Sequence, residues 1–409
     1  MKPSNGPSAG ERAVLERIRA EELVELTQRL VAARGENPPG QEAATVTELV
    51  AAARERGFAG ELSEVEPGRD NVDVTLDAGD GPGLLLLGHT DVVPVGDGWT
   101  VDPFGGAVRD GRIYGRGTTD MKGGLAACLV AMTALRDAGL PLAGPVQLAA
   151  VVDEEAADIG IQHWTRRLGE RRAGGELPAY RGCVVAEPTD LQTIIAARGA
   201  SYLEIRVTGQ AAHAGNPADG RSAIYGAARI VSELERWHEQ YAGDRHPLVG
   251  ARTWNVGTIH GGTGGSIVPA ECRITVDRRL LPGESPTEVL AETRARLDRL
   301  GLADRGLGLE VEMTMDMPGF ETAAGHEFVR CVDGALGGVG GPGLPLGGWT
   351  AACDGGYVAR DHGVPTVVLG PGSVAEQAHR ADESVGIEEL VVAARAYALT
   401  ALRLLAPAS

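Results

Sequence analysis

The strongest constraint on the fold is a series of short apolar runs that end abruptly in acidic or imidazole side chains. Three of them read "LLLLGHTD" from residue 84, "VQLAAVVDEE" from residue 146 and "CVVAEPTD" from residue 183. Such runs suit strands that are buried on both faces of a sheet, and helical stretches lie between them. The alternation of these strands with helices predicts an α/β domain with a mixed, largely parallel sheet.

The pattern changes between residues 200 and 315. There the sequence predicts a strand, a helix, two strands, a helix and a strand, over residues 201–209, 221–241, 253–261, 272–280, 285–301 and 309–317. This order is typical of a ferredoxin-like α+β sandwich. Because the strand "PTVVLG" and the closing helix from residue 387 return to the α/β pattern, we predict an inserted domain over 200–315. The surrounding α/β domain then covers 11–199 and 316–409.

The N-terminal segment carries two further expectations. Residues 1–10 are predicted to form a disordered tail, and a single helix is predicted over residues 11–34, up to "GENPPG". The first residues contain no apolar stretch after the lysine, and no run approaches the ~18 apolar residues of a membrane span. We therefore expect a protein that is neither exported nor inserted in a membrane.

Charge and cysteine content narrow the function classes. Asp and Glu number 56 against 38 Lys and Arg, which gives a formal net charge of −18. This balance argues against nucleic acid or an anionic membrane as a partner. The five cysteines are widely spaced and never form a CxxC pair, so neither a disulfide framework nor a thiolate zinc site is indicated. A reducing cytoplasm is the expected location.

Potential metal ligands follow the predicted strands. His89 and Asp91 come directly after the strand "LLLLG", and two residues of extended chain would point both side chains the same way. A carboxylate beside a ligating histidine is a common supporting partner. The alternative is a polar pair at a strand end. Asp120 lies between a glycine-rich turn and a helix, where a helix N-cap is the alternative.

Further acids and a histidine complete the set. Glu154, Glu155 and Glu187 follow strand ends, and His379 follows a strand and a loop. In α/β sheets ligands bind at this edge. Two histidines and three carboxylates suit two zinc ions that share one carboxylate, roughly 3.5–4 Å apart. Such cations would also compensate the repulsion among the consecutive acids that begin at Asp153.

The motifs resemble one known family over nearly the whole chain. They are "NPPG" at residue 37, "GHTDVVPVG", "GRGTTDMKGG", "VVDEEAADIG", "AEPTD", "DRRLLPGES" and "LGPGSVAEQAHRADE". Their sequence and order resemble the dinuclear zinc amidohydrolase and metallopeptidase family that includes acetylornithine deacetylase, succinyl-diaminopimelate desuccinylase, aminoacylase and carboxypeptidase G. The resemblance implies a zinc-binding catalytic domain and an inserted lid or dimerisation domain.

The resemblance also assigns roles at the metal site. It implies that His89 and Glu187 hold one zinc, that Glu155 and His379 hold the other, and that Asp120 bridges them; cobalt or manganese could replace zinc. Glu154 is implied as the general base, and Asp91 is implied as the carboxylate that supports His89. A cis peptide is implied between Asp120 and Met121.

Substrate contacts are implied at four positions. His213 is expected to reach the active site of a partner subunit in a homodimer and polarise the scissile carbonyl, and its alternative is a loop histidine. Arg279 is expected to bind a substrate carboxylate, and its alternative is a salt bridge to Asp277. Gly372 and Ser373 of "LGPGSVAEQAH" are expected to contact substrate. Gly265, Ser266 and Ser222 stand where the family often has asparagine, so contacts are not carried over there.

The expected function is hydrolysis of the amide bond of a small N-acyl amino acid or related amine that bears a free carboxylate. A first alternative is a dipeptidase or carboxypeptidase that acts on short peptides. A second is a metal-free binding or scaffold protein on the same fold. The complete ligand set and the intact Glu154 argue against the second alternative, since a protein without catalysis has no need of the base.

Overall fold

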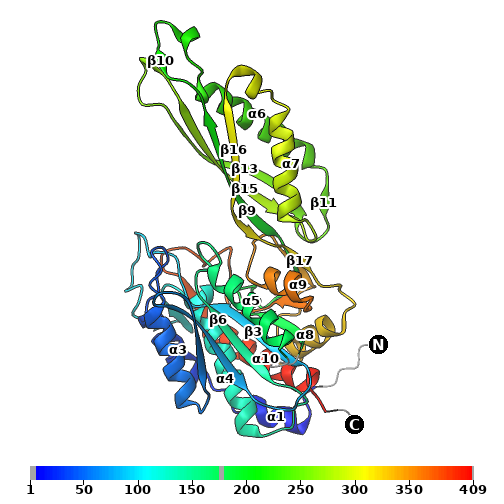
Figure 1. Cartoon of the computed structure of the whole chain (residues 1–409). Coiled ribbons are helices and arrows are strands. Elements are labelled where there is room, and N and C mark those ends of the chain that lie inside the picture. Colours follow the sequence, from blue (N-terminus) through cyan, green and yellow to red (C-terminus); the bar gives the residue numbers. More distant parts are fainter. Residues whose placement is uncertain (1–5, 175–178, 408–409) are drawn as a thin grey trace. The chain divides into compact units, whose positions relative to one another are not determined.

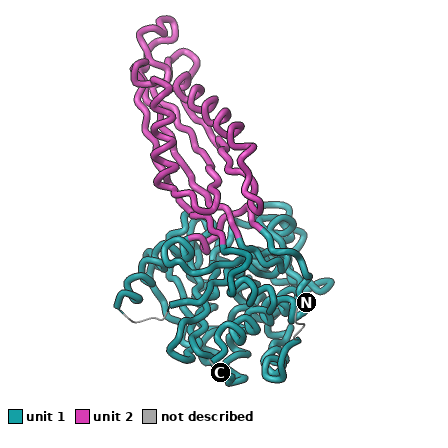
Figure 2. Tube along the Cα trace, turned by 90° about the vertical axis from the view of Figure 1, so that its right-hand side faces the viewer, with its two compact units in different colours: residues 1–195, 322–347, 357–409 teal, residues 196–321, 348–356 magenta. Residues whose placement is uncertain are grey.

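The computed structural model describes residues 6–174 and 179–407, and it divides the chain into two compact units (Figure 2). Unit 1 comprises residues 1–195, 322–347 and 357–409, and unit 2 comprises residues 196–321 and 348–356. The assignment of a catalytic role to the first and of a lid or dimerisation role to the second stays a prediction.

Unit 1 is built on a mixed sheet (Figure 1). Within unit 1 the strand order is β1-β2-β6-β3-β7-β19-β8; the last residues of β8, 196–197, belong to unit 2, where β17 pairs with them. The bounds are β1 Gly60–Glu66, β2 Arg69–Leu76, β6 Val146–Val151, β3 Gly83–His89, β7 Tyr180–Val185, β19 Thr366–Val368, β8 Ile194–Ala197 and β17 Phe320–Glu321. The four strands β6, β3, β7 and β19 are parallel neighbours, and antiparallel strands flank them. The predicted mixed α/β class is confirmed.

The central strands are apolar because they are enclosed. All residues of β3 and β6 are buried, which explains why their sequences lack the alternation of half-exposed strands. Helix α4 packs against α2 and α10, and most of its residues are buried. The helices of this unit are α1 Ala9–Leu15, α2 Ala20–Ala32, α3 Ala43–Glu55, α4 Gly123–Ala138, α5 Ile159–Ala173, α8 Glu327–Gly338 and α10 Ile387–Leu404; α9 Gly355–His362 begins at the boundary between the units.

Two expectations for the N-terminal segment are wrong. The predicted helix over 11–34 is broken, because Arg19 is extended (φ −109°, ψ 139°) and α2 begins after it. The break lets α1 and α2 pack separately against α4 and α10. The sequence gives no local signal for it, because residues 11–34 contain neither glycine nor proline. The predicted tail 1–10 is also partly helical. The Ser8 hydroxyl and the Glu11 carboxylate form a capping box, so α1 begins at Ala9. Residues 1–5 lie outside the described part.

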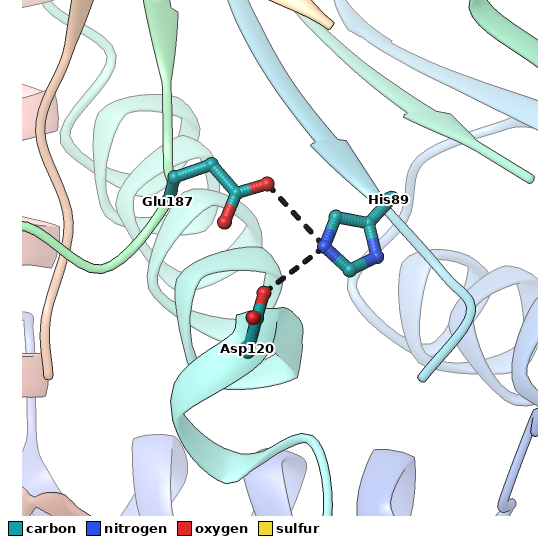
Figure 3. A group of neighbouring side chains, drawn as sticks. All are labelled: His89, Asp120 and Glu187. Atoms are coloured by element: carbon teal, nitrogen blue, oxygen red, sulfur yellow. Dashed lines mark hydrogen bonds and ion pairs between the residues drawn. The ribbon is translucent and has the colours of Figure 1, made fainter. Parts of the chain in front are cut away.

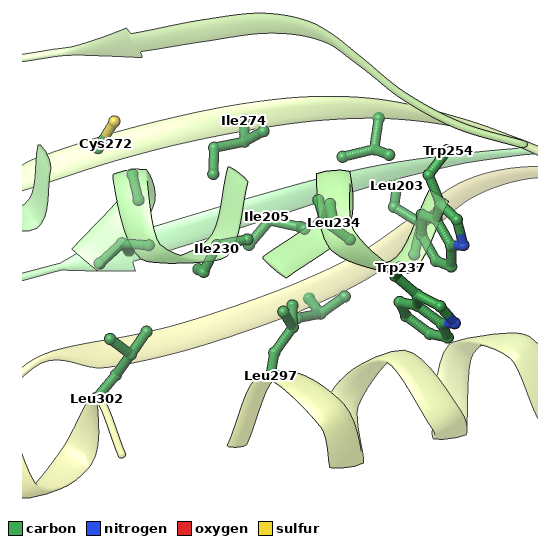
Figure 4. Close-up of a cluster of buried hydrophobic side chains, with 14 of the residues drawn as sticks. Leu203, Ile205, Ile230, Leu234, Trp237, Trp254, Cys272, Ile274, Leu297 and Leu302 are labelled. Atoms are coloured by element: carbon green, nitrogen blue, oxygen red, sulfur yellow. The ribbon is translucent and has the colours of Figure 1, made fainter. Parts of the chain in front are cut away.

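Unit 2 is a four-stranded antiparallel sheet with two helices. The strand order is β13-β15-β9-β16, with β9 Gly199–Thr208, β13 Thr253–Gly261, β15 Glu271–Leu280 and β16 Gly308–Met317. Helices α6 (Ala223–Tyr241) and α7 (Pro286–Asp298) supply the two crossovers, so the predicted ferredoxin-like order is confirmed. Ile205, Ile274, Ile230 and Leu297 belong to the apolar core between sheet and helices (Figure 4).

No helix within residues 6–174 and 179–407 is both long enough and apolar enough to cross a membrane.

Candidate metal centre

The sheet edge of unit 1 gathers three of the predicted ligands. His89 is the last residue of β3, Glu155 follows β6, and Glu187 follows β7. Strands β6, β3 and β7 are parallel neighbours, so their carboxyl ends lie at one edge of the sheet. The order of the strands therefore brings together side chains that are far apart in the sequence.

The first group consists of His89, Asp120 and Glu187 (Figure 3). The Nε2 atom of His89 lies 3.2 Å from Oδ1 of Asp120 and 3.3 Å from Oε1 of Glu187. One donor atom from each residue lies within 4.8 Å of the others. One imidazole nitrogen and two carboxylate oxygens are suitable ligands for a divalent transition-metal ion such as Zn²⁺.

The second group shares Asp120 with the first. The Nε2 atom of His379 lies 3.3 Å from Oδ2 of Asp120 and 3.1 Å from Oε2 of Glu155. Asp120 thus directs one oxygen to each histidine, which is the arrangement that a bridging carboxylate requires. The structure brings the five predicted ligands together as two groups of three, and this geometry supports two neighbouring metal ions.

The electrostatics of the groups also fit cations. Burial raises the pKa of Glu187 to about 7, because its charged form loses solvation and lies near other acids. Burial alone would lower the pKa of His89, but Glu187, Asp120 and Asp91 raise it well above its ordinary value. Hydrogen bonds with Asp120 and Glu155 raise the pKa of His379 to about 10. The crowded carboxylates therefore attract positive charge, which bound metal ions would supply.

The backbone around Asp120 is irregular. Residues Thr118–Lys122 form a π-helical turn, in which Asp120 has non-helical angles (φ −119°, ψ 92°). The cis peptide predicted between Asp120 and Met121 is present. The alternative that Asp120 caps the next helix is wrong, because Lys122 is the N-cap residue of α4.

Glu383 holds this turn, and the sequence did not reveal it. Its Oε1 atom accepts hydrogen bonds from the backbone N–H groups of Thr119 (2.9 Å) and Asp120 (3.0 Å). Its Oε2 atom accepts from the N–H of Gly117 (3.1 Å) and from the Arg116 guanidinium (2.7 Å). The Glu383 side chain is fully buried. Glu383 therefore connects the turn that carries Asp120 to the segment that carries His379.

A short sheet explains how Glu383 reaches the turn. Strand β20 (Ser384–Gly386) pairs with β5 (Arg112–Tyr114), which in turn pairs with β4 (Ala107–Arg109). This pairing places residue 383 beside the chain that leads into residues 116–120. Strands of three residues leave almost no periodic signal, and an acid in "HRADES" resembles a surface acid when it is read without its partners.

Asp91 organises the turn that contains Glu154 and Glu155. Its carboxylate accepts hydrogen bonds from the backbone N–H groups of Glu154 (3.2 Å) and Glu155 (3.0 Å). Its Oδ1 atom lies 3.5 Å from Nδ1 of His89, whereas the carbonyl oxygen of Asp91 lies 3.0 Å from that nitrogen. The backbone carbonyl is thus the nearer partner of the imidazole, and the supporting role predicted for the carboxylate stays a prediction.

One of the three consecutive acids is compensated by the protein itself. Oδ1 of Asp153 accepts from Arg69 (2.6 Å) and from the amide of Asn37 (2.8 Å). The expectation that metal ions compensate all three acids is therefore wrong for Asp153, because its strand-end position faces Arg69. Glu154 is partly exposed, and among the described residues it belongs to neither potential metal-binding group.

Gly372 and Ser373 connect their own loop to residues 189–190 and to Glu389 of α10. The N–H of Gly372 donates to Glu389 (2.9 Å), and its carbonyl accepts from the N–H of Asp190 (2.7 Å). A Cβ atom at Gly372, which has φ 84°, would lie 2.8 Å from Cγ2 of Thr119. Ser373 forms a β-bridge with Thr189. These contacts are structural, and substrate binding by the two residues stays a prediction.

The other two predicted residues belong to unit 2. The Arg279 guanidinium lies 2.9 Å from Asp277, so the salt bridge considered as its alternative is present. His213 is exposed, and its Nδ1 accepts from the N–H of Gly215 (3.0 Å). Their participation in a site formed by residues of unit 1 stays a prediction.

Comparison with known proteins gives consistent matches. Residues 85–403 match the peptidase family M20/M25/M40. The chain is 31% identical over 354 residues to an acetylornithine deacetylase of Vibrio campbellii, a match that covers 85% of this chain and 87% of that protein.

Two solved structures show the same fold. An M20 family metallo-carboxypeptidase from Sulfolobus solfataricus has a TM-score of 0.76 at 19% identity and covers 93% of this chain and 98% of its own. A dinuclear metal binding peptidase of the M20 family from Bacillus subtilis has a TM-score of 0.70 at 16% identity, with 94% and 98% covered.

Proposed function

Because the chain belongs to the peptidase family M20/M25/M40, a family of metal-dependent hydrolases, we propose that it removes a short acyl group from a small N-acyl amino acid or a related amine. The observation that carries the proposal is the pair of three-residue groups that share Asp120, beside the turn that carries Glu154. The similarity to an acetylornithine deacetylase supports an acyl amide over a peptide as the substrate.

Two metal ions are part of the proposal. His89 and Glu187 would hold one ion, Glu155 and His379 would hold the other, and Asp120 would bridge them. Bound there, zinc or alternatively cobalt or manganese would supply Lewis-acid activation of water and of the scissile carbonyl. The donor set of two imidazoles and three carboxylates is compatible with each of these metals.

Glu154 is proposed as the general base. It would take a proton from the attacking water and pass this proton to the nitrogen of the departing amine, so that an acid and an amine are released. Its backbone N–H is held by the buried carboxylate of Asp91. Its side chain is partly exposed, so it could meet a substrate at the sheet edge.

Arg279 is proposed to bind the free carboxylate of the substrate. A guanidinium can hold a carboxylate through two parallel hydrogen bonds, which fixes the orientation of the substrate as well as its charge. Side-chain exposure of Arg279 is 28%, so part of the guanidinium remains accessible beside Asp277. In this role the existing salt bridge would orient Arg279 for the substrate.

A homodimer is proposed in which His213 of the partner subunit polarises the scissile carbonyl. The support within unit 2 is that β13 lies at a sheet edge, with residues 257–261 exposed. Such an edge can pair with a second copy. Mixing inactive His213→Ala and Glu154→Gln subunits should restore part of the activity, and a fully active monomer in sedimentation would contradict the proposal.

A substrate screen tests the function itself. We expect hydrolysis of N-acetyl, N-formyl or N-succinyl amino acids, with little turnover of dipeptides, and no turnover by metal-stripped enzyme. Preferred cleavage of dipeptides or of C-terminal residues would instead assign the chain to the dipeptidase or carboxypeptidase alternative. A protein that binds no metal and hydrolyses none of these substrates would support the scaffold alternative.

A further inference from the structure

Unit 2 contains a pocket whose basic residues have no role in the proposed hydrolase function. Its volume is about 550 Å³, within the range of pockets that bind small molecules. The apolar part of its lining, here called the floor, includes Ile267 and Val268 of strand β14 (Ile267–Val268) and Leu307, just before β16. Ser222 and Tyr225, at the start of α6, supply hydroxyl groups. The side chain of Ile267 is 45% exposed, so apolar surface is available to a ligand.

The charged part of the lining, here called the rim, is basic. Three of its lining residues are Arg221, Arg229 and Arg305, and none is acidic. Within the described residues no ion pair involves any of the three arginines. Asp219 and Asp304, both in the described part of the chain, are close to these arginines in the sequence but form no ion pair with them, and Oδ2 of Asp304 lies 3.3 Å from an ideal Cβ at Gly301. In a protein of net charge −18, three uncompensated guanidinium groups around one pocket mark a local preference for anions.

One of these arginines is held in place without being neutralised. The Arg221 guanidinium donates to the backbone carbonyls of Ala218 (3.0 Å) and Gly220 (2.6 Å). Its Nε atom lies 3.3 Å from an ideal Cβ at Gly306, next to Arg305. Other arginines of the same unit have carboxylate partners, such as Arg206 with Glu271 at 2.7 Å and Arg273 with Glu204 at 2.5 Å. The difference indicates that the charge of the rim is available to a ligand.

We propose that this pocket binds a small organic anion, with an apolar body against the floor and a phosphate or carboxylate group against the arginines. Guanidinium groups bind both anions through paired hydrogen bonds. The proposal does not depend on the hydrolase function. A ligand would also touch β14, which pairs with β10 (Ala212–His213) through His213↔Ile267, so it would contact the strand that supports a residue proposed for catalysis.

Calorimetric titration of the intact protein tests the binding. The probes are phenyl phosphate, phenylacetate and the neutral 2-phenylethanol, which share an aromatic ring and differ in charge. We expect both anions or one of them to bind and the alcohol not to bind. Tighter binding of phenyl phosphate would identify a phosphate ligand class, and tighter binding of phenylacetate a carboxylate class. Equal binding of the alcohol would overturn the proposal.

Variants locate the site. Arg229→Gln combined with Arg305→Gln should weaken binding by at least about tenfold, because two charge-assisted hydrogen-bonding groups are lost. Both side chains are exposed, so the fold should persist, and equal melting temperatures would verify it. Arg299→Gln, at the end of α7 and outside the pocket lining, is the matched control and should bind like the wild type. Binding that is unchanged in the double variant would place the anion elsewhere, for instance at the metal centre, and would overturn the proposal.

Discussion

The two units of this protein place several of their charge pairs in different environments, although Arg278 of unit 2 is buried beside Glu284. In unit 1 several charges at the carboxyl edge are buried, as for Glu383 with Arg116. In unit 2 the ion pairs Arg206–Glu271 and Arg273–Glu204 lie on exposed side chains. Buried charges are costly unless they are paired, whereas exposed pairs contribute little. The buried charges of unit 1 are therefore better evidence of a functional site than the exposed ion pairs of unit 2.

The largest expected effect separates two adjacent acids of unit 1. Glu154→Gln should lower kcat by roughly 10²–10⁴-fold, because it removes the proposed base, and it should leave the metal content unchanged. Glu155→Gln should instead weaken metal binding. Steady-state kinetics and elemental analysis of both variants measure the two effects. Near-normal turnover of Glu154→Gln would show that the base lies elsewhere.

A matched pair of substitutions compares buried and exposed carboxylates directly. Glu383→Gln should destabilise the protein by about 3–5 kcal/mol, since it leaves buried Arg116 without its charged partner. Glu271→Gln in unit 2 should have a much smaller effect, because the Glu271 carboxylate and its arginine partners are solvent-exposed. Denaturant unfolding measures both values, and the Glu383 variant should also bind metal more weakly because Asp120 loses its support. Similar losses for the two variants would remove the contrast between the units.

Metal removal should affect the two units unequally. Ligands that bind only the native state stabilise it by about 2.7 kcal/mol at a hundredfold excess over Kd. Chelation should therefore increase amide hydrogen exchange at residues 117–122 and 377–383 of unit 1, whereas strands β9 and β15 of unit 2 should exchange as before. Readdition of zinc should reverse the change. Uniform protection with and without metal would argue against the proposed ligand set.

The smallest expected effect concerns Arg279 on unit 2. Arg279→Lys should reduce kcat/KM on a carboxylate substrate by about tenfold, because a lysine cannot form the paired hydrogen bonds of a guanidinium. The methyl ester of the same substrate should be a poor substrate for both proteins and should show no such difference. Equal losses on acid and ester would mean that Arg279 acts only through its salt bridge to Asp277.

Local sequence patterns were sufficient to predict the central strands and to place the proposed ligands just after them. The runs before His89, Glu155 and Glu187 are short and almost wholly apolar, so they predict enclosed parallel strands. Neighbouring parallel strands end at one edge, which explains why residues far apart in the sequence meet there. The β-α-β-β-α-β order of unit 2 followed from the same periodicities.

Long-range contacts decided the remaining features. The break after α1 has no local breaker and depends on packing against α4 and α10. The partners of Glu383 are backbone N–H groups more than 260 residues away, and those of Asp153 include Arg69 from another strand. The basic pocket joins three segments that are separated in sequence. Periodicity predicts whether a residue lies on the buried or the exposed face of its own helix or strand. Which charges become neighbours depends on contacts that close long loops, so only the folded chain determines it.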